Sequence, residues 1–377
     1  MKQGYVIKQV KDICSKGSSQ VAQKDLEGLT GDYPIYGASG LIKNVDFYHQ
    51  EKEYIGLVKD GSGIGRVMFL PPQSSVIGTL QYILPIDGFN IRYIGYCLQS
   101  LRLDKYKQGA AIPHIYFKDY GEAKILVATN PDEQKRIVNL LDAEFAKIDT
   151  LKANAERNLQ NAKDLFQAAL KKELEAKEGW KKTILQDICT NIVDCPHTTP
   201  VKSSTKTDYP CIRTSELRNG EIYWETMQYV DESEYRKRVL RLVPQENDIV
   251  YGREGTFGDA VLLPKRFHFC LGQRTMLFRP NSELVIPRFL LLYVISPYVF
   301  EQAKSKNTGC GVAHVNVRDI KEFNINLPPI HIQQSIVAHL DALNEKCKTL
   351  QANYEKTIVL CDDLKQALLR KAFNGEI

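Results

Sequence analysis

Two long stretches of the chain carry a helical pattern of apolar positions. Residues 131–177 and 328–377 contain neither glycine nor proline after Pro131 and Pro329 until Gly375. Both are dense in Ala, Leu, Glu, Lys and Gln, which have high helix propensity. A proline in the first turn of a helix sacrifices no hydrogen bond, so it suits the beginning of each stretch. The pattern therefore predicts two long helices.

Apolar or small residues recur every seven positions in both predicted helices. They are Leu141, Ile148, Ala155, Ala162 and Ala169 in the first helix, and Leu340, Cys347, Tyr354, Cys361 and Leu368 in the second. A seven-residue apolar stripe is typical of a helix that packs against a partner helix. Because one stripe is mostly small and the other larger, we expect the two helices to pair with each other as an antiparallel coiled coil. The alternative is that each helix packs only on its own globular part.

The remaining residues, 1–130 and 178–327, are rich in short β-type runs broken by glycine and proline. Examples are residues 54–58 and 275–278, and a stretch at 288–295 has a helical composition. Such alternation predicts a mixed α/β globule in each part. The fold class expected is α+β, with two α/β domains and two long antiparallel coiled-coil helices. The helical stretches 131–177 and 328–377 follow the two domains.

The two halves of the chain are copies of one module and would be related by a pseudo-twofold internal repeat. Gly4-Tyr5 and Asp12-Ile13-Cys14 recur as Gly179-Trp180 and Asp187-Ile188-Cys189, and Gly109, His114 and Asp119 recur as Gly309, His314 and Asp319. In the helices, Gln134 and Asp142 recur as Gln333 and Asp341. Ordered matches of this kind indicate a duplication. The second copy carries an insertion of about 18 residues in or near 221–243.

The composition of the chain excludes few classes of function. The net charge of +5 arises from 50 basic and 45 acidic residues, so a nucleic-acid partner is admitted but not required. The nine cysteines are scattered and form no CxxC pair, which fits a reducing compartment. No apolar run approaches the length of a membrane span. A cytoplasmic protein is therefore expected.

The order of several local marks, repeated twice, resembles the specificity subunits of type I restriction–modification systems. The marks include the module openings at 12–13 and 179–188, the run Pro210 to Leu217, and the helix entrances at 130–134 and 327–337. The resemblance covers essentially the whole chain. It implies that each globular module is a target recognition domain that reads one half of a bipartite DNA site.

The resemblance also implies partners and cofactors outside this chain. The paired helices would space the two domains and dock two methyltransferase subunits, which bind S-adenosylmethionine and methylate adenine. Two restriction/translocase subunits, which use ATP and Mg, would complete the complex. No cofactor is expected in this chain itself.

Two glycine-containing loops are candidates for DNA contact. Each follows a strand-like run and has a basic residue two positions before its first glycine. Backbone amides of such loops can approach phosphates, and Arg or Lys can reach phosphates or guanine edges. The candidate residues are Lys59, Ser62 and Arg66 in the first loop and Arg253 and Thr256 in the second. The alternative is a tight hairpin turn whose glycines only supply a positive φ.

Other polar and basic side chains on predicted loops are candidates for the same role. They are Tyr36, Ser39, Lys43 and His114 in the first module, and Arg213, Thr214, Ser215, Arg218, Arg236, Lys237, Arg238, Gln273, Arg274, His314 and Asn316 in the second. The dense basic cluster at 235–238 is expected to bind phosphate, with a solvated helix face as the alternative. Capped turns and turn-stabilising histidines are equally good interpretations of the others. Leu80-Gln81 stands roughly where the second copy has Gln273-Arg274, so the modules should read different bases.

The sequence offers no catalytic or metal site. It lacks a phosphate-binding Walker A loop, an Asn/Asp-Pro-Pro-Tyr/Phe methyltransferase motif and HExxH. Cys189, Cys195 and His197 lack a fourth ligand at a suitable spacing for zinc. Two rival functions remain. A scaffold that does not bind DNA would show no DNA affinity with any partner, and a stand-alone nuclease would cleave DNA in the presence of a metal ion.

Overall fold

The computed structural model describes residues 4–61, 63–109, 112–255, 258–306 and 314–377. The chain divides into two compact units. The first is formed by Met1–Arg157 and Tyr354–Ile377, and the second by Asn158–Asn353. Within the described ranges, no helix is both long enough and apolar enough to cross a membrane.

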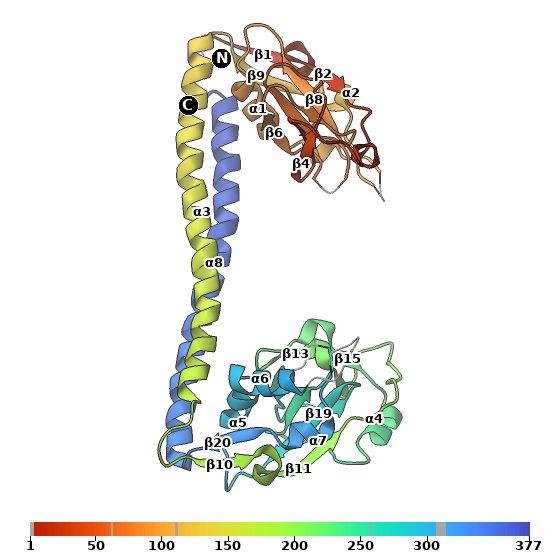
Figure 1. The fold of residues 1–377 in the computed structure, drawn as a ribbon, viewed down its shortest axis with the longest axis vertical. Coiled ribbons are helices and arrows are strands. Elements are labelled where there is room, and N and C mark those ends of the chain that lie inside the picture. Colours follow the sequence, from red (N-terminus) through yellow and green to blue (C-terminus); the bar gives the residue numbers. More distant parts are fainter. Residues whose placement is uncertain (1–3, 62, 110–111, 256–257, 307–313) are drawn as a thin grey trace. The chain divides into compact units, whose positions relative to one another are not determined.

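The first unit is built on a four-stranded antiparallel sheet (Figure 1). In spatial order its strands are β2 (Cys14–Ser18), β8 (Leu80–Pro85), β5 (Tyr54–Val58) and β6 (Val67–Leu70). A three-stranded sheet contains β4 (Gly40–Val45), β3 (Tyr33–Gly37) and β7 (Ser75–Val76), and β1 (Tyr5–Gln9) pairs with β9 (Lys124–Ala128). The short helices are α1 (Ile91–Ser100) and α2 (Phe117–Tyr120), with 3-10 turns η1 (Val10–Asp12), η2 (Gln23–Leu26) and η3 (Leu103–Tyr106).

The second unit repeats this topology with additions. Its four-stranded antiparallel sheet runs β11 (Cys189–Asp194), β19 (Thr275–Pro280), β16 (Ile249–Gly252) and β17 (Ala260–Leu262). The smaller sheets are β15 (Gln228–Tyr229), β12 (Pro210–Ile212) and β18 (Cys270–Leu271); β13 (Leu217–Arg218) with β14 (Glu221–Ile222); and β10 (Lys181–Ile184) with β20 (Asn324–Leu327). The helices are α4 (Glu232–Arg238), α5 (Pro287–Val294), α6 (Pro297–Ser305) and α7 (Val317–Lys321), with turns η4 (Leu185–Ile188), η5 (Thr214–Glu216) and η6 (Trp224–Thr226). The second copy has an additional segment between β12 and β16, which contains β13, β14, η6 and α4.

The central strand of each large sheet is apolar on both faces because each face meets its own core. In β5, Ile55 and Leu57 belong to one buried cluster and Tyr54 and Val58 to another. Successive side chains of a strand point to opposite faces, so this alternation follows directly from the run of apolar residues. The larger core of each unit also takes in the long helices. Buried residues from those helices are Ile137, Val138, Leu141, Leu369 and Phe373 in the first unit and Phe166, Leu170, Ile336, Leu340 and Cys347 in the second.

The two long helices are α3 (Pro131–Glu173), of 43 residues, and α8 (Ile330–Phe373), of 44 residues. They pack together and run antiparallel (Figure 1). In the first unit, Lys152 pairs with Asp362 at 2.7 Å and Asp149 pairs with Lys365, so residue numbers fall on one helix as they rise on the other. The expected α+β fold class with two long antiparallel helices is confirmed, and the two domains, expected to be α/β, are β-rich.

Candidate nucleic-acid interface

Three segments that are distant in the sequence meet at one end of the four-stranded sheet in the first unit. Lys59, which follows β5, donates its backbone N–H to Thr79 O at 3.0 Å. Its own carbonyl accepts from Ile115 N at 2.9 Å, and Gly61 N donates to Pro113 O at 2.9 Å. The glycine-containing loop, the turn before β8 and the loop around His114 therefore form one cluster. Loops held on a rigid sheet in this way commonly carry binding functions.

The second unit builds the same cluster. Arg253 N donates to Arg274 O at 3.0 Å, and Arg253 O accepts from Val315 N at 3.0 Å. A β-bridge joins Glu254 to His314, as one joins Asp60 to His114 in the first unit. The equivalent pairs are Lys59 with Arg253, Asp60 with Glu254, Thr79 with Arg274, and His114 with His314.

This register corrects the sequence alignment of the turn before β8. Val58 pairs with Leu80 in the first unit, and Gly252 pairs with Thr275 in the second. Leu80 is thus the counterpart of Thr275. The counterpart of Arg274 is Thr79, not Gln81, because the match inferred from sequence alone was shifted by two residues.

The first cluster carries a small polar network. The Asp60 carboxylate lies 2.7 Å from Nδ1 of His114 and 3.8 Å from Nζ of Lys59. The Lys59 side chain is 30% exposed. The Thr79 hydroxyl is buried and has no hydrogen-bond partner among the described residues. The surface of this cluster is therefore set by Lys59, Asp60 and His114.

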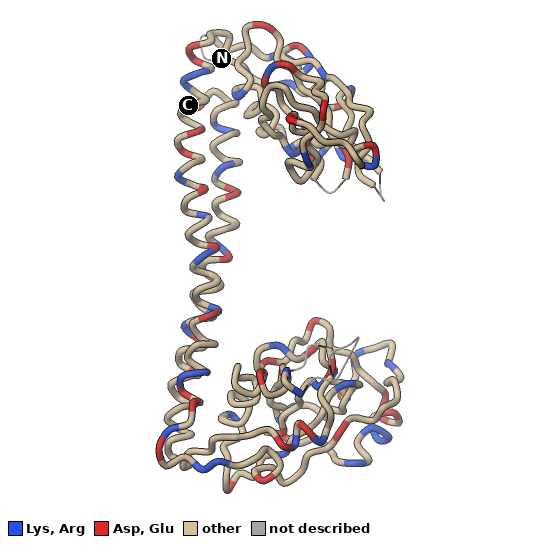
Figure 2. The backbone as a smooth tube through the Cα atoms, viewed as in Figure 1, with Lys and Arg blue, Asp and Glu red and all other residues tan. Residues whose placement is uncertain are grey.

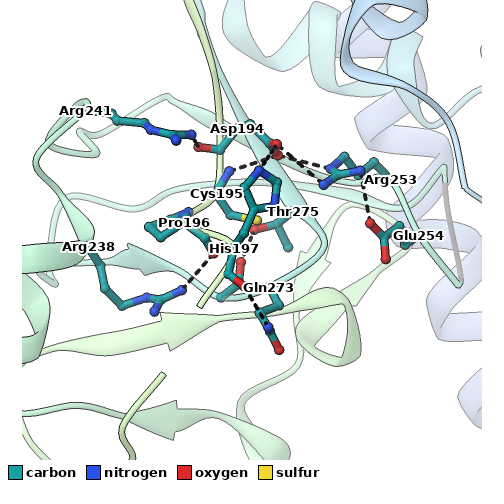
Figure 3. A network of polar contacts seen from close by, with 11 residues as sticks. Asp194, Cys195, Pro196, His197, Arg238, Arg241, Arg253, Glu254, Gln273 and Thr275 are labelled. Carbon is teal, nitrogen blue, oxygen red and sulfur yellow. Dashed lines mark hydrogen bonds and ion pairs between the residues drawn. The ribbon is translucent and has the colours of Figure 1, made fainter. Parts of the chain in front are cut away.

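The second cluster carries a chain of alternating charges (Figure 3). The Arg253 guanidinium is only 10% exposed and donates from Nε to Asp194 at 3.0 Å. Its Nη1 lies 3.0 Å from the Glu254 carboxylate. The other Glu254 oxygen lies 3.3 Å from Nε of Arg274, whose side chain is 53% exposed. Arg274 is thus the outward end of a chain that begins at buried Arg253.

The basic cluster on α4 divides into buried and exposed members. Arg238 is buried and donates to Leu271 O at 2.8 Å and to Thr198 O at 3.2 Å, which fastens α4 to β18 and to the loop after β11. Figure 3 shows its further contact with Pro196 O. Its guanidinium is therefore engaged inside the module rather than displayed to a phosphate. Arg236 pairs with Glu232 on the same helix and is 76% exposed, and Lys237 is also exposed.

The other candidates were expected on loops, but Tyr36, Lys43 and Arg218 lie in strands. Arg66 donates to Ala38 O at 2.8 Å, which ties the first loop to the β3–β4 hairpin that carries Tyr36, Ser39 and Lys43. Lys43 donates to Leu26 O at 3.1 Å. In the second unit, Arg213 and Ser215 donate hydrogen bonds to the Glu216 carboxylate, and Thr214 is the first residue of η5. The Arg218 guanidinium lies over the Tyr223 ring. Gln273 donates to His197 O, and Asn316 donates to the Asp319 carboxylate. Ser62 and Thr256 lie outside the described residues.

Sequence reasoning missed the acidic members of both clusters. Asp60 and Glu254 each follow the basic residue directly, in Lys-Asp-Gly and Arg-Glu-Gly, so their recurrence was a visible signal. Asp194 carried no such signal, because its role depends on β11 lying beside β19. The acids decide which basic groups remain available, so they matter as much as the basic residues.

The residues of the two seven-residue stripes are mostly buried, and Leu141, Leu340 and Cys347 belong to the domain cores. Leu141, Ile148, Ala155, Ala162, Leu340, Cys347 and Cys361 are buried, and Ala169, Tyr354 and Leu368 are half-buried. Four leucines three positions after stripe members are exposed instead. They are Leu151 (51%), Leu165 (48%), Leu350 (40%) and Leu364 (47%).

These exposed leucines follow the internal repeat. Leu151 recurs as Leu350 and Leu165 as Leu364, each 199 positions later. Leu151 and Leu364 lie in the first unit at the level of the Lys152–Asp362 ion pair, and Leu165 and Leu350 lie in the second unit. Each unit therefore presents one copy of the same apolar pair.

Charge is distributed evenly over the chain. Figure 2 shows basic and acidic residues interspersed along both helices and over both modules. Within the part of the chain that the structure describes, no group of three or more His, Cys, Asp or Glu side chains could hold a metal ion. Recognition by these surfaces would depend on individual side chains more than on a broad positive field.

Comparison with known proteins identifies relatives over most of the chain. Residues 2–160 and 177–358 match the family profile described as type I restriction modification DNA specificity domain. The type I restriction enzyme EcoBI specificity subunit of Escherichia coli is 23% identical over 272 residues, and the EcoKI specificity subunit of Escherichia coli strain K12 is 26% identical over 269 residues. Each alignment covers 65% of this chain and 56% of the relative, so the chain spans little more than half the length of these curated relatives.

Two solved structures share the fold. One, from work on complex assembly and conformational transition of the type I R-M system, has a TM-score of 0.77 at 14% identity and covers 100% of this chain and 99% of its own. The crystal structure of the HsdS subunit from Thermoanaerobacter tengcongensis has a TM-score of 0.56 at 15% identity, with coverage of 100% and 98%. At these identities the likeness concerns the fold.

Proposed function

The chain belongs to the type I restriction–modification DNA specificity family, and from that membership we propose that it reads DNA for a type I complex without catalysing a reaction itself. Residues 1–130 and 178–327 are the target recognition domains in this proposal. Each contacts one half of a bipartite, asymmetric site. The helical stretches 131–177 and 328–377 set the unread gap between the halves.

The observation that carries the proposal is the duplicated loop cluster. One backbone arrangement displays Lys59, Asp60 and His114 in the first unit, and a different set that includes Glu254 and Arg274 in the second. Sequence is read through hydrogen bonds to base edges, whereas phosphate contacts only position the protein. Two readers with the same geometry and different side chains would recognise two different half-sites.

Within each domain, we assign DNA contact to the exposed members of the predicted set. Arg66, Arg218, Arg236 and Lys237 have exposed side chains suited to phosphates. Lys59, His114, Gln273, Arg274 and His314 belong to the two clusters and are suited to base edges. Ser62 and Thr256, on the same loops, remain predictions. Arg238 and Arg253 act from inside the module, where they hold α4 and Glu254 in place.

The repeated leucine pairs support the docking of two copies of one partner. An exposed leucine that becomes buried contributes about 1.5–3 kcal/mol. Leu151 with Leu364, and Leu165 with Leu350, offer the same pair once in each unit. Two methyltransferase subunits, which supply S-adenosylmethionine, would dock there, and two restriction/translocase subunits would supply ATP and Mg chemistry.

Co-expression with the cognate methyltransferase, followed by single-molecule methylome sequencing, tests the proposal. We expect adenine methylation at a motif made of two specific halves and an unread gap. Salt-titrated gel shifts provide a second test, since a net charge of +5 should give weak, salt-sensitive binding by the chain alone and tighter binding with the methyltransferase. A chain that bound no DNA at low salt with any partner would be a scaffold, and the proposal would be wrong.

A further inference from the structure

Arg274 stands in an unusual backbone conformation at the edge of the second loop cluster. Its φ is +68°, in the left-handed region that residues other than glycine rarely adopt. The position immediately precedes β19, and the carbonyl of Arg274 is fixed by the 3.0 Å hydrogen bond from Arg253 N. Non-glycine residues held in this region cluster at binding sites, where the surrounding structure maintains the strain.

The guanidinium of Arg274 also pairs with a carboxylate inside the cluster. Glu254 lies 3.3 Å from its Nε, and Glu254 is in turn fixed by Arg253, which Asp194 holds at 3.0 Å. The ion pair is made at Nε, and among the described residues no hydrogen bond or ion pair is found to the two terminal nitrogens. Those two nitrogens form the fork that makes paired hydrogen bonds to a planar acceptor.

The charges of the cluster favour a base over a phosphate as that acceptor. The charges of the four side chains Asp194, Arg253, Glu254 and Arg274 cancel, and the His197 ring also lies 3.3 Å from Asp194. A phosphate gains little from a neutral cluster and is repelled by Glu254. Guanine is neutral overall and presents O6 and N7, the pair of acceptors that an arginine fork recognises in the major groove.

The first module has no arginine at the position equivalent to Arg274. Thr79 replaces Arg274, its hydroxyl is buried, and Gly78 replaces Gln273. The same backbone site therefore displays a fixed arginine in one module and no long basic side chain in the other. The backbone differs as well, because Arg274 has a positive φ and Thr79 does not.

We propose that Arg274, oriented by Glu254, reads one guanine in the half-site of the second module. The inference rests on the proposed function, because it assumes that this module contacts DNA. Arg274 is the specificity-determining residue, and Glu254 is a positioning residue. The first module should have no arginine-read guanine at the corresponding position.

The test compares methylomes from cells that co-express the methyltransferase with the wild-type chain, Arg274→Ala or Arg274→Asn. Asparagine tolerates a positive φ, so the second variant keeps the backbone while it removes the fork. A bidentate arginine contact corresponds to a preference for guanine of about 5- to 150-fold. We expect that preference to disappear at one position of one half-site, while the other half-site and the gap stay unchanged.

Arg102→Ala is the matched control. Arg102 is also an arginine at positive φ, +51°, and its ion pair with Asp104 at 3.6 Å leaves it 63% exposed. It lies in the first unit, where it lines a pocket with Gly63, Gly65 and Arg66, so its removal should leave the half-site of the second module intact. Glu254→Gln should weaken the preference for guanine only partly, because the amide still fills the position of the carboxylate.

A binding measurement is needed if the complex with an Arg274 variant methylates too little DNA for a motif to be identified. The purified complex is titrated against duplexes that carry each of the four bases at every position of the second half-site. Equal loss of affinity for all four bases would identify a phosphate contact and overturn the inference. An unchanged motif would also overturn it. A wild-type motif without two halves would instead refute the proposed function, so the two failures are distinguishable.

Discussion

Gln134 and Gln333, which occupy equivalent positions in α3 and α8, each close the same three hydrogen bonds in their own unit. Gln134 Oε1 accepts from Asn90 N at 2.8 Å, and its Nε2 donates to Gly88 O at 3.2 Å and Ala128 O at 3.0 Å. Gln333 accepts from Ile286 N at 2.8 Å and donates to Leu284 O at 3.1 Å and Pro328 O at 2.8 Å. A single buried amide thus joins a long helix to its domain twice in the chain.

Removing either glutamine should destabilise its own unit. In Gln134→Ala, three backbone groups around a side chain that is 1% exposed lose their partner. Leaving buried polar groups unsatisfied costs about 1–3 kcal/mol each, moderated by any water that enters. Hydrogen exchange should therefore accelerate in the first unit for Gln134→Ala and in the second for Gln333→Ala. Acceleration spread equally over both units would contradict this local role.

The leucine pairs on the helices predict a stepwise loss of partner subunits. The double variant Leu151→Asp/Leu364→Asp removes the apolar pair of the first unit. The double variant Leu165→Asp/Leu350→Asp removes the apolar pair of the second unit. Since each buried leucine contributes about 1.5–3 kcal/mol, each double variant should weaken one site at least 100-fold. Native mass spectrometry should find two methyltransferase copies on the wild type and one on each double variant.

Leu41→Asp and Leu240→Asp serve as controls for that experiment. Both leucines are well exposed, at 60% and 83%, and neither lies on α3 or α8. Their replacement should leave two methyltransferase copies bound. If a helix double variant still bound two copies, docking would have to occur on another surface.

The sequence predicted the helix pair because its pattern is local, but it could not divide the leucines into buried and exposed. Leu350 and Leu364 each follow a member of the seven-residue stripe by three positions, and the sequence pattern does not show whether they are covered. A seam of two helices covers only one side of each helix, so leucines three positions after the stripe remain at its margin. Their exposure depends on the number of helices in the bundle, which a single stripe does not encode.

The loop clusters show the same limit. The sequence showed that a basic residue precedes the glycine in both loops. It did not show that Arg253, the basic residue of the second loop, is buried, whereas the separate candidate Arg274 is exposed. What separates them is Asp194 on β11, which reaches Arg253 only through the pairing of β11 with β19. The match of Arg274 with Thr79 likewise required the strand register, since loop length had obscured it. Contacts between distant strands therefore decided the details of the site.

Buried thiols should report the integrity of each unit. Burial raises the pKa of Cys14 to about 12 in the first unit and the pKa of Cys189 to about 12 in the second. The thiolate is the reactive form, and an unperturbed cysteine has a pKa of about 8.5. Alkylation by iodoacetamide at pH 8 should therefore be about 1,000-fold slower at these residues than in the unfolded chain. Mass spectrometry of a time course checks this, and rapid labelling at pH 8 would contradict it.

The same raised pKa values of Cys14 and Cys189 determine in which direction the free energy of unfolding changes with pH. Because the folded-state pKa of each thiol lies above its unfolded value, the protonated thiol favours the folded state. This contribution is complete below about pH 8.5 and is lost as the pH rises toward 12. The free energy of unfolding should fall above pH 8.5, and Cys14→Ser should reduce that fall in the first unit. An unchanged slope for Cys14→Ser would assign the alkaline loss to other groups.

Lengthening both long helices together should lengthen the unread gap in the DNA site. Seven residues inserted after Leu151 in α3 add roughly 10 Å at 1.5 Å per residue, which corresponds to about three base pairs at 3.4 Å each. Because Lys152 pairs with Asp362 and Asp149 with Lys365, the matching insertion in α8 belongs after Asp362. Seven residues also preserve the apolar stripe, whereas a single turn added to α3 alone would shift it against α8.

Methylome sequencing should then find the two original half-sites separated by about three additional base pairs. Insertion into α3 alone is the control and should reduce methylation, because the stripes no longer meet. If the double insertion changed a half-site, the helices would influence base reading itself. If it left the gap unchanged, the distance between half-sites would be set by the partner subunits, and the spacer role of 131–177 and 328–377 would be wrong.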